Sequence, residues 1–241
     1  MKIVEKLAQK AKRNWDFPGV TIAFLGDSVT QGCFEIYHEC TDSINTIFDK
    51  NCAYHTYFAR IMAILYPSVP VNIVNAGISG GNTSHALERL ERDVIKHSPD
   101  LTIVCFGLND CGNGPSGLDE YANSLEQIFK NLKNAGSEII FMTPNMMATQ
   151  ISCHITDAKF KEIANGAMHS QNEGILDMYL DTAKELCKKH AITVCDCYKK
   201  WKTLYNNGVN VTELLSNKIN HPTRDMNWLF AISLIETIMG I

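Results

Sequence analysis

The sequence predicts an α/β fold in which helices cover both faces of a parallel sheet. Three observations lead to this class: short apolar runs, helical patterns between them, and polar or glycine-rich turns after them. Nearly continuous apolar runs are typical of parallel strands, because both faces of such a strand are buried. The five runs are Val20–Leu25, Val71–Val74, Leu101–Phe106, Glu138–Thr143 and Ala191–Cys195.

Amphipathic patterns between the runs predict the covering helices. One helix has Tyr121, Leu125, Ile128 and Leu132 on a single face. Ser116 and Asp119 have the spacing of a capping box at its start, and Gly136 follows its end. Three further helices are expected around Leu87–Val94, Tyr57–Tyr66 and Asp225–Met239. Strands alternating with helices indicate βαβ units, and hence a three-layer α/β/α sandwich.

Length and charge limit the classes of protein that fit. The 241 residues, 45% of them hydrophobic, suit one globular domain over 1–241, with 1–17 as a helical extension packed on it. The net charge of −4 argues against a nucleic-acid partner. No apolar run approaches the roughly 18 residues of a membrane span, and residues 1–17 lack the apolar core of a signal peptide. Self-association into a homo-oligomer stays open.

The cysteines predict reduced thiols and a cytoplasmic protein. There are nine, an odd number, and none forms a C-x-x-C pair. Cys105 lies in an apolar run and is expected in the core. Cys195 and Cys197 are two ligands without a matching pair elsewhere, so no metal site is expected.

Residues that suit acyl transfer follow several of the predicted strands. Ligands of open α/β sheets bind beyond the carboxyl ends of the strands. Ser28 follows the first run in the stretch "GDSVTQG", a glycine-rich turn follows the second in "NAGISGGNTS", and Asn109 follows the third in "GLND". His221 lies in "NHP" before the last helix, where Pro222 favours an extended loop. A nucleophile, a base and donors for an oxyanion are thereby expected at one edge.

Each residue type has a chemical reason to be there. A serine hydroxyl becomes a useful nucleophile when a base removes its proton, and histidine can do this near neutral pH. The negative oxygen of a tetrahedral intermediate needs fixed N–H donors. Backbone amides of a glycine turn and an asparagine side chain can supply them. This chemistry needs no metal and no cofactor.

The four blocks, met in order from residue 26 to 222, resemble the GDSL or SGNH hydrolases. The resemblance implies a flavodoxin-like sandwich with five parallel strands and esterase, lipase or carbohydrate-deacetylase activity. It implies Ser28 as nucleophile, His221 as base, and the amides of Ser28 and Gly80 with the Asn109 side chain as oxyanion donors. The substrate would be a small acyl ester, with an acetylated carbohydrate favoured and a lysophospholipid or thioester as the alternative.

The chain departs from the family three residues before the histidine. The family usually has an aspartate there, and this chain has Lys218. Losing the orienting carboxylate of a triad can cost about 10⁴ in kcat through the wrong tautomer. A backbone carbonyl accepting from Nδ1 would restore the tautomer, so we predict a Ser28–His221 dyad, with Asp225 as a less favoured orienter.

Several polar residues near these blocks have simpler structural interpretations. Asp27 is expected to accept backbone hydrogen bonds in its turn. Asn82 and Thr83 resemble helix caps, and Asp110 is expected to tie loops together. The long segments 33–53 and 144–175 are expected to line the substrate site, where Tyr37, Phe48, Met146 and Trp228 could form walls.

Other functions are also compatible with parts of the sequence. Ser79 lies in a G-x-S-x-G pattern that could be a nucleophile elbow, although too few strands precede it for that fold. His85 is a second candidate base. Without a third triad member, the chain could be a binding module that keeps the fold. A nucleotide-binding role for "GDSVTQG" is disfavoured, because the Lys-Ser/Thr ending of a P-loop is absent.

Two substitutions separate the two candidate nucleophiles. We expect Ser28→Ala to abolish nearly all ester turnover, because the reacting hydroxyl is removed, and Ser79→Ala to retain it. Turnover of p-nitrophenyl esters by both variants measures this. Loss of activity in Ser79→Ala with activity kept in Ser28→Ala would reverse the assignment.

Overall fold

The centre of the protein is a five-stranded parallel sheet. The computed structural model describes residues 1–38 and 43–241. The strand order is β4-β1-β5-β6-β7, and all four neighbouring pairs are parallel. This doubly wound order reverses between β1 and β5, which is the switch point where such sheets bind ligands. The strands are β1 (Val20–Gly26), β4 (Val71–Gly77), β5 (Leu101–Cys105), β6 (Glu138–Met142) and β7 (Thr193–Cys195).

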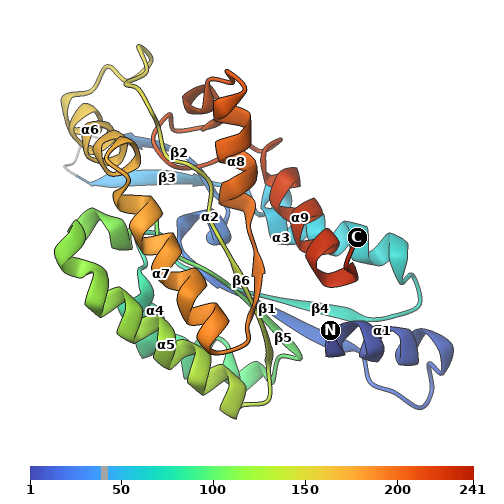
Figure 1. Ribbon diagram of the computed structural model, residues 1–241. Coiled ribbons are helices and arrows are strands. Elements are labelled where there is room, and N and C mark those ends of the chain that lie inside the picture. Colours follow the sequence, from blue (N-terminus) through green and yellow to red (C-terminus); the bar gives the residue numbers. More distant parts are fainter. Residues whose placement is uncertain (39–42) are drawn as a thin grey trace.

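Helices cover the two faces of this sheet, which confirms the predicted sandwich (Figure 1). One layer contains α4 (Thr83–Asp93), α5 (Leu118–Asn134) and α7 (Ile175–Lys189). The opposite layer contains α1 (Lys2–Lys12), α3 (Tyr54–Leu65) and α9 (Asn227–Met239). The remaining helices are α2 (Ser28–Gln31), α6 (Ala158–Asn172) and α8 (Cys197–Asn206), and short 3₁₀ turns span Lys50–Cys52, Ile95–His97, Asp110–Asn113, Pro115–Gly117 and Val211–Leu214.

A hairpin of β2 (Cys33–His38) and β3 (Ile44–Phe48) lies at the same end of the sheet as α2 (Figure 1). The sequence indicated only a long segment over 33–53, because polar residues interrupt its apolar positions. Residues 39–42, with Cys40, lie outside the described residues. The hairpin places β2 immediately after the turn that carries Ser28, and this becomes important at the site.

The predicted start of α5 is wrong. The helix begins at Leu118 after Gly117, and no side chain caps it. Pro115 starts a 3₁₀ turn that contains Ser116, whose hydroxyl donates to the carbonyl of Asn113 at 3.0 Å. Proline favours the first position of a helical turn, and here it outweighs the capping signal.

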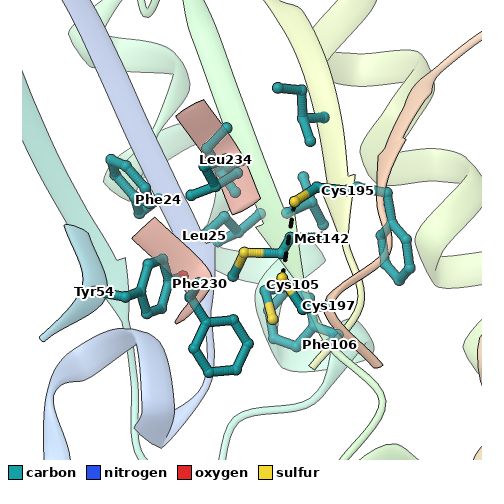
Figure 2. Close-up of a cluster of buried hydrophobic side chains, with 14 of the residues drawn as sticks. Phe24, Leu25, Tyr54, Cys105, Phe106, Met142, Cys195, Cys197, Phe230 and Leu234 are labelled. Carbon is teal, nitrogen blue, oxygen red and sulfur yellow. Dashed lines mark hydrogen bonds between the residues drawn. The ribbon is translucent and has the colours of Figure 1, made fainter. Parts of the chain in front are cut away.

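Buried apolar side chains from both helical layers and the sheet form one continuous core. Figure 2 shows Phe24 and Leu25 of β1 beside Phe230 and Leu234 of α9. Cys105 lies in this core as predicted. The Sγ atoms of Cys195 and Cys197, both buried, are 3.8 Å apart in the same cluster and are unbridged (Figure 2).

The N-terminal helix packs on the amino ends of the strands. Ile3 and Leu7 of α1 are buried in the core. The carboxylate of Glu138 accepts from the amides of Lys2 and Ile3 at 3.1 and 2.9 Å, so it satisfies donors that the helix itself leaves free. Across the described ranges, no helix combines the length and apolar character needed to cross a membrane.

The close approach of α2 to β4 depends on Gly77. A Cβ at Gly77 would lie 2.3 Å from the amide nitrogen of Gln31, so even alanine would force α2 away. We expect Gly77→Ala to lower the free energy of unfolding by about 1–3 kcal/mol.

Gly166→Ala in α6 is the matched control, since a Cβ there meets nothing within 4 Å. Its expected effect is a gain of about 0.4–1 kcal/mol. Urea denaturation measures both values. Equal stabilities for the two variants would show that a Cβ at position 77 can be accommodated beside the backbone of α2.

Candidate active site

Ser28 lies directly after β1, at the first position of the short helix α2. The Asp27 carboxylate accepts from the amide of Val29 at 2.9 Å and caps this helix, which confirms the structural role predicted for Asp27. As the first helical residue, Ser28 has an amide with no partner inside the helix. Ser28 is only 5% exposed, so its hydroxyl is largely shielded from solvent.

Arg89 of α4 ties together the strand ends that precede Ser28 and the glycine turn. Its guanidinium donates to the carbonyl oxygens of Ala76 at 2.6 Å and Gly26 at 3.0 Å, and also contacts Asp93 at 3.2 Å. The side chain is buried. The turns after β1 and β4 are therefore joined through one rigid cation.

His221 contacts Ser28 directly. Its Nε2 lies 2.9 Å from Oγ of Ser28, and its Nδ1 lies 2.8 Å from the carbonyl oxygen of Phe34 in β2. A carbonyl can only accept, so Nδ1 carries the proton and Nε2 is left to accept from the serine hydroxyl. The acceptor for Nδ1 is thus the kind of group expected from the sequence, a backbone carbonyl.

The loop that carries His221 is held by Asn217. The Oδ1 atom of Asn217 accepts from the amides of Ile219, Asn220 and His221, each at 2.9–3.0 Å. Lys218 adopts a left-handed backbone with φ of 58° and pairs with Glu213 at 2.8 Å. The Lys218 side chain, at the position where the family has aspartate, therefore pairs with Glu213 and not with the imidazole.

Asp225 does not orient His221 either. It is exposed in the turn before α9, where its carbonyl accepts from the amide of Trp228 at 3.2 Å. The alternative orienter considered from the sequence is thus wrong.

Gly80 and Asn109 follow β4 and β5, the two strands that flank β1. Gly80 has φ of 73° in the turn before α4. The side-chain amide of Asn109 donates to the carbonyl of Gly81 at 2.8 Å, which joins the two turns and leaves one amide hydrogen available. Among the described residues, neither Gly80 nor Asn109 hydrogen-bonds to Ser28 or His221.

Asn82 and Asp110 have the structural roles predicted for them, whereas Thr83 does not cap a helix. Thr83 is the first residue of α4, and its hydroxyl donates to Asp110 at 2.7 Å. Asn82 caps α4 by accepting from the amide of His85 at 3.0 Å. Asp110 accepts from the amide and hydroxyl of Thr83 and from the amide of Gly107, so it links the turns after β4 and β5.

The competing candidates lie elsewhere. Ser79 is exposed in the glycine turn, and its amide donates to the Gln31 side chain at 2.6 Å. His85 is exposed on α4. Of the suggested pocket walls, Met146 is buried in the core and Trp228 stacks on Tyr57 at 4.3 Å. Neither therefore lines the cavity described next.

A cavity of about 470 Å³ lies beside Asn109 and Asn220, the residue before His221. Much of its wall is apolar, with Met147 from the segment after β6, Ile163 from α6 and Ile219 from the histidine loop. Of the two long segments expected to line the substrate site, 144–175 contributes to this cavity, whereas the described residues of 33–53 do not. No group of three or more metal-ligating side chains occurs in residues 1–38 and 43–241.

Burial governs the ionisation of the site. Desolvation lowers the pKa of His221 to about 4, against the smaller opposing effects of the Phe34 carbonyl and the Glu35 charge. Desolvation also raises the pKa of Asp27 to about 7, with the nearby Asp110 carboxylate adding to the rise. At pH 7 the imidazole is therefore neutral, and Asp27 is divided between its two forms.

Three residues at the site were not identified from the sequence: Phe34, Asn217 and Arg224. Phe34 contributes a main-chain atom, which no residue type can indicate. Arg224 pairs with Glu35, 189 positions away along the chain. The only local signal was Asn217, since asparagine commonly organises turns by accepting backbone hydrogen bonds.

A doubly wound sheet with a serine–histidine pair at its carboxyl edge defines a class of α/β proteins with the arrangement of serine hydrolases. The model of the GDSL-like lipase/acylhydrolase family matches residues 24–229, and this chain belongs to that family. The resemblance noted in the four sequence blocks is thereby confirmed.

Individual relatives are more distant. The chain is 30% identical over 135 residues to an acetylxylan esterase of Geobacillus stearothermophilus, in an alignment covering 52% of this chain and 60% of that protein. It is 29% identical over 82 residues to an arylesterase of Vibrio mimicus, covering 33% and 40%. The chain thus matches less than two thirds of the length of these two curated relatives.

Solved structures share the fold over most of the chain. A crystal structure of the Geobacillus stearothermophilus acetylxylan esterase has a TM-score of 0.68 at 22% identity, covering 92% of this chain and 94% of that one. An α/β hydrolase enzyme from the metagenome of Lake Arreo, Spain, has a TM-score of 0.67 at 17% identity, covering 91% and 95%. Structures of the Geobacillus stearothermophilus esterase include catalytic mutants in which a serine or a histidine is replaced by alanine.

The raised pKa of Asp27 predicts a pH-dependent cost to folding. The native state holds a proton on Asp27 that the unfolded state loses near pH 3.8, so this group lowers stability as pH rises from about 4 to 7. An asparagine side chain at this position would keep the acceptor for Val29 without the charge. We expect Asp27→Asn to be more stable than the wild type by on the order of a few kcal/mol at pH 8, and by little at pH 4.

Thermal or urea unfolding from pH 4 to 8 measures the difference between the two proteins. His221 contributes the opposite slope, since its lowered pKa makes stability fall as pH drops from 6.5 to about 4. It is present in both proteins and cancels. A difference in stability that stays constant from pH 4 to 8 would show that folding does not raise the pKa of Asp27.

Proposed function

We propose that this chain is a serine esterase that hydrolyses small acyl esters through an acyl-Ser28 intermediate, with acetylated carbohydrate as the favoured substrate. The observation that carries the proposal is the pair of hydrogen bonds at His221, with Nε2 2.9 Å from Oγ of Ser28 and Nδ1 2.8 Å from the Phe34 carbonyl. A base oriented in this way can remove the serine proton without rearrangement.

The reaction proceeds in two halves. Nε2 of His221 takes the proton as Oγ of Ser28 forms a bond to the ester carbonyl carbon. The tetrahedral intermediate collapses, the C–O bond to the alcohol breaks, and the imidazolium returns the proton to the leaving oxygen. Water then loses a proton to the same nitrogen and attacks the acyl-serine. Collapse of the second intermediate releases the acid, and Ser28 recovers its proton.

Three donors are proposed for the negative oxygen of both intermediates. The amide of Ser28 has no partner within α2, the amide of Gly80 follows a neighbouring strand, and Asn109 has one amide hydrogen left after its bond to Gly81. Their turns follow three adjacent strands, β1, β4 and β5. Fixed donors of this kind contribute about 2.7–4 kcal/mol each to the stability of the transition state.

The substrate proposal draws on the relatives and the cavity together. An acetylxylan esterase and an arylesterase are among the proteins that this chain is similar to. The apolar wall of the cavity beside Asn109 also favours a second candidate, an esterase for longer acyl chains such as lysophospholipids or acyl thioesters. Both share the acyl-serine chemistry and differ in the preferred chain length.

The proposal extends to the setting of the enzyme. The eight described cysteines are free, which favours a reducing compartment, and we propose a cytoplasmic location. We propose that one domain over 1–241 carries the whole activity.

Covalent labelling tests the nucleophile. We expect a fluorophosphonate probe to label the wild type at Ser28, with peptide mass spectrometry locating the adduct, and not to label Ser28→Ala. Hydrolysis of p-nitrophenyl acetate, butyrate and octanoate then measures the acyl preference, which we expect to be highest for acetate. A folded wild type that neither labels nor hydrolyses would instead support a binding module.

The pH dependence tests the base. Protonation of Nε2 removes the base, so kcat/KM should fall as pH drops through the His221 pKa of about 4, and should be nearly level from about pH 6 to 8. A change in kcat/KM near pH 7 would contradict this expectation, because it would indicate that ionisation of Asp27 controls the rate. The Asp27→Asn variant distinguishes the two ionisations, since it removes that of Asp27 and keeps that of His221.

A further inference from the structure

We infer that Arg224 is a positioning residue. It holds the Phe34 carbonyl, which takes the place of a triad carboxylate, against Nδ1 of His221. This inference rests on the proposed function of His221 as the base. It goes beyond the dyad itself, because it identifies what keeps a neutral main-chain acceptor in the correct place.

The Phe34 carbonyl is available because the hairpin is irregular at this position. Cys33 pairs with Phe48 and Ile36 pairs with Thr46, so two residues of β2, Phe34 and Glu35, stand opposite one residue of β3. Such a bulge breaks the ladder of strand hydrogen bonds and turns backbone groups out of it. The freed carbonyl oxygen lies 2.8 Å from Nδ1 of His221. A bulge is also where a strand can bend most easily, so this acceptor needs external support.

Arg224 contacts both residues of the bulge and Asp49, which follows β3. Its Nη1 and Nη2 donate to the two carboxylate oxygens of Glu35 at 2.6 and 3.1 Å, and its Nε donates to Asp49 at 3.0 Å. Its guanidinium carbon lies 4.4 Å from the centre of the Phe34 ring. A planar guanidinium fixes both distance and direction in such a bidentate pair, which a lysine cannot do.

The same arginine joins both ends of the hairpin to the histidine loop. The amide of Asp49 donates to the carbonyl of Gly32 at 2.9 Å, immediately before β2. Arg224 is three residues after His221, and the amide of Thr223 between them donates to the carbonyl of Leu214 at 2.9 Å. The base and the support for its acceptor therefore belong to one anchored segment.

The contacts of Arg224 suit a positioning role more than a stabilising one. Its side chain is 35% exposed and that of Glu35 is 37% exposed. Ion pairs at such exposure contribute about 0–1 kcal/mol to stability. Loss of Arg224 should therefore leave the protein folded while the acceptor becomes mobile.

Charge adds a second expected effect. Glu35 in β2 is the charged group that acts on His221, and its negative charge raises the imidazole pKa. Arg224 neutralises Glu35 and Asp49 and lowers the pKa of both carboxyls. Without the arginine, the Glu35 carboxylate would attract the imidazolium more strongly.

The experiment compares Arg224→Gln with the wild type. We expect kcat for p-nitrophenyl acetate to fall by about 10- to 100-fold with little change in KM, because misplaced catalytic groups lower the chemical step without touching the substrate pocket. The acid limb of the pH profile should move to higher pH. Nitrogen NMR of protein labelled with ¹⁵N-histidine should show the Nδ1–H tautomer of His221 in the wild type and a mixture in Arg224→Gln.

Three further variants sharpen the comparison. Glu35→Gln should reproduce the loss of kcat without the shift to higher pH, since it breaks the bidentate pair and removes the charge. Arg224→Lys should restore the pH profile more than kcat. Lys218→Asn is the matched control, because it removes a cation and an ion pair from the same loop, and asparagine tolerates its left-handed backbone.

The outcomes separate the two proposals. Wild-type kcat and an unchanged tautomer in folded Arg224→Gln would overturn the positioning role while leaving the esterase intact. A wild type that cleaves no ester would overturn the esterase. The tautomer measurement needs no substrate, so it would still decide whether Arg224 holds the Phe34 carbonyl on His221.

Discussion

The hydrogen bond from Nδ1 of His221 to the Phe34 carbonyl is the interaction on which the rest of the site depends. It decides which imidazole nitrogen faces Ser28, because a ring held by Nδ1–H presents an unprotonated Nε2. The bond also connects the two ends of the chain. Phe34 lies in the hairpin after the first strand, and His221 precedes the last helix, so one hydrogen bond joins residues 187 positions apart in the chain.

A neutral acceptor has different electrostatic consequences from a carboxylate. A buried aspartate would stabilise the imidazolium and raise its pKa, whereas the carbonyl leaves desolvation dominant. The imidazole is consequently a weaker base, but it is unprotonated at neutral pH. The buried carboxyl of Asp27, close to Ser28, is partly protonated under the same conditions. The site thus limits negative charge near Ser28, whose oxygen becomes more negative in the proposed reaction.

The sequence was sufficient for the sheet and most covering helices, because buried strands such as Leu101–Cys105 leave nearly continuous apolar runs. It was insufficient for the hairpin, since the half-exposed β2 has no clear alternation. The contact between Ser28 and His221 could be predicted, because the residue types themselves suggest the pairing. The residue that accepts from Nδ1 could not be predicted, because every residue has a carbonyl and only the fold brings that of Phe34 to the imidazole.

The bulge in β2 also affects how the site tolerates mutation. A triad aspartate can be deleted by one codon change, whereas the acceptor at position 34 is a main-chain oxygen that every amino acid carries. Substituting Phe34 alters the ring that packs on Arg224 but not the oxygen that meets Nδ1. No single substitution at position 34 can therefore remove the acceptor of His221. The mutations expected to disturb it are substitutions at residues that shape β2, and insertions or deletions that change the register of the hairpin.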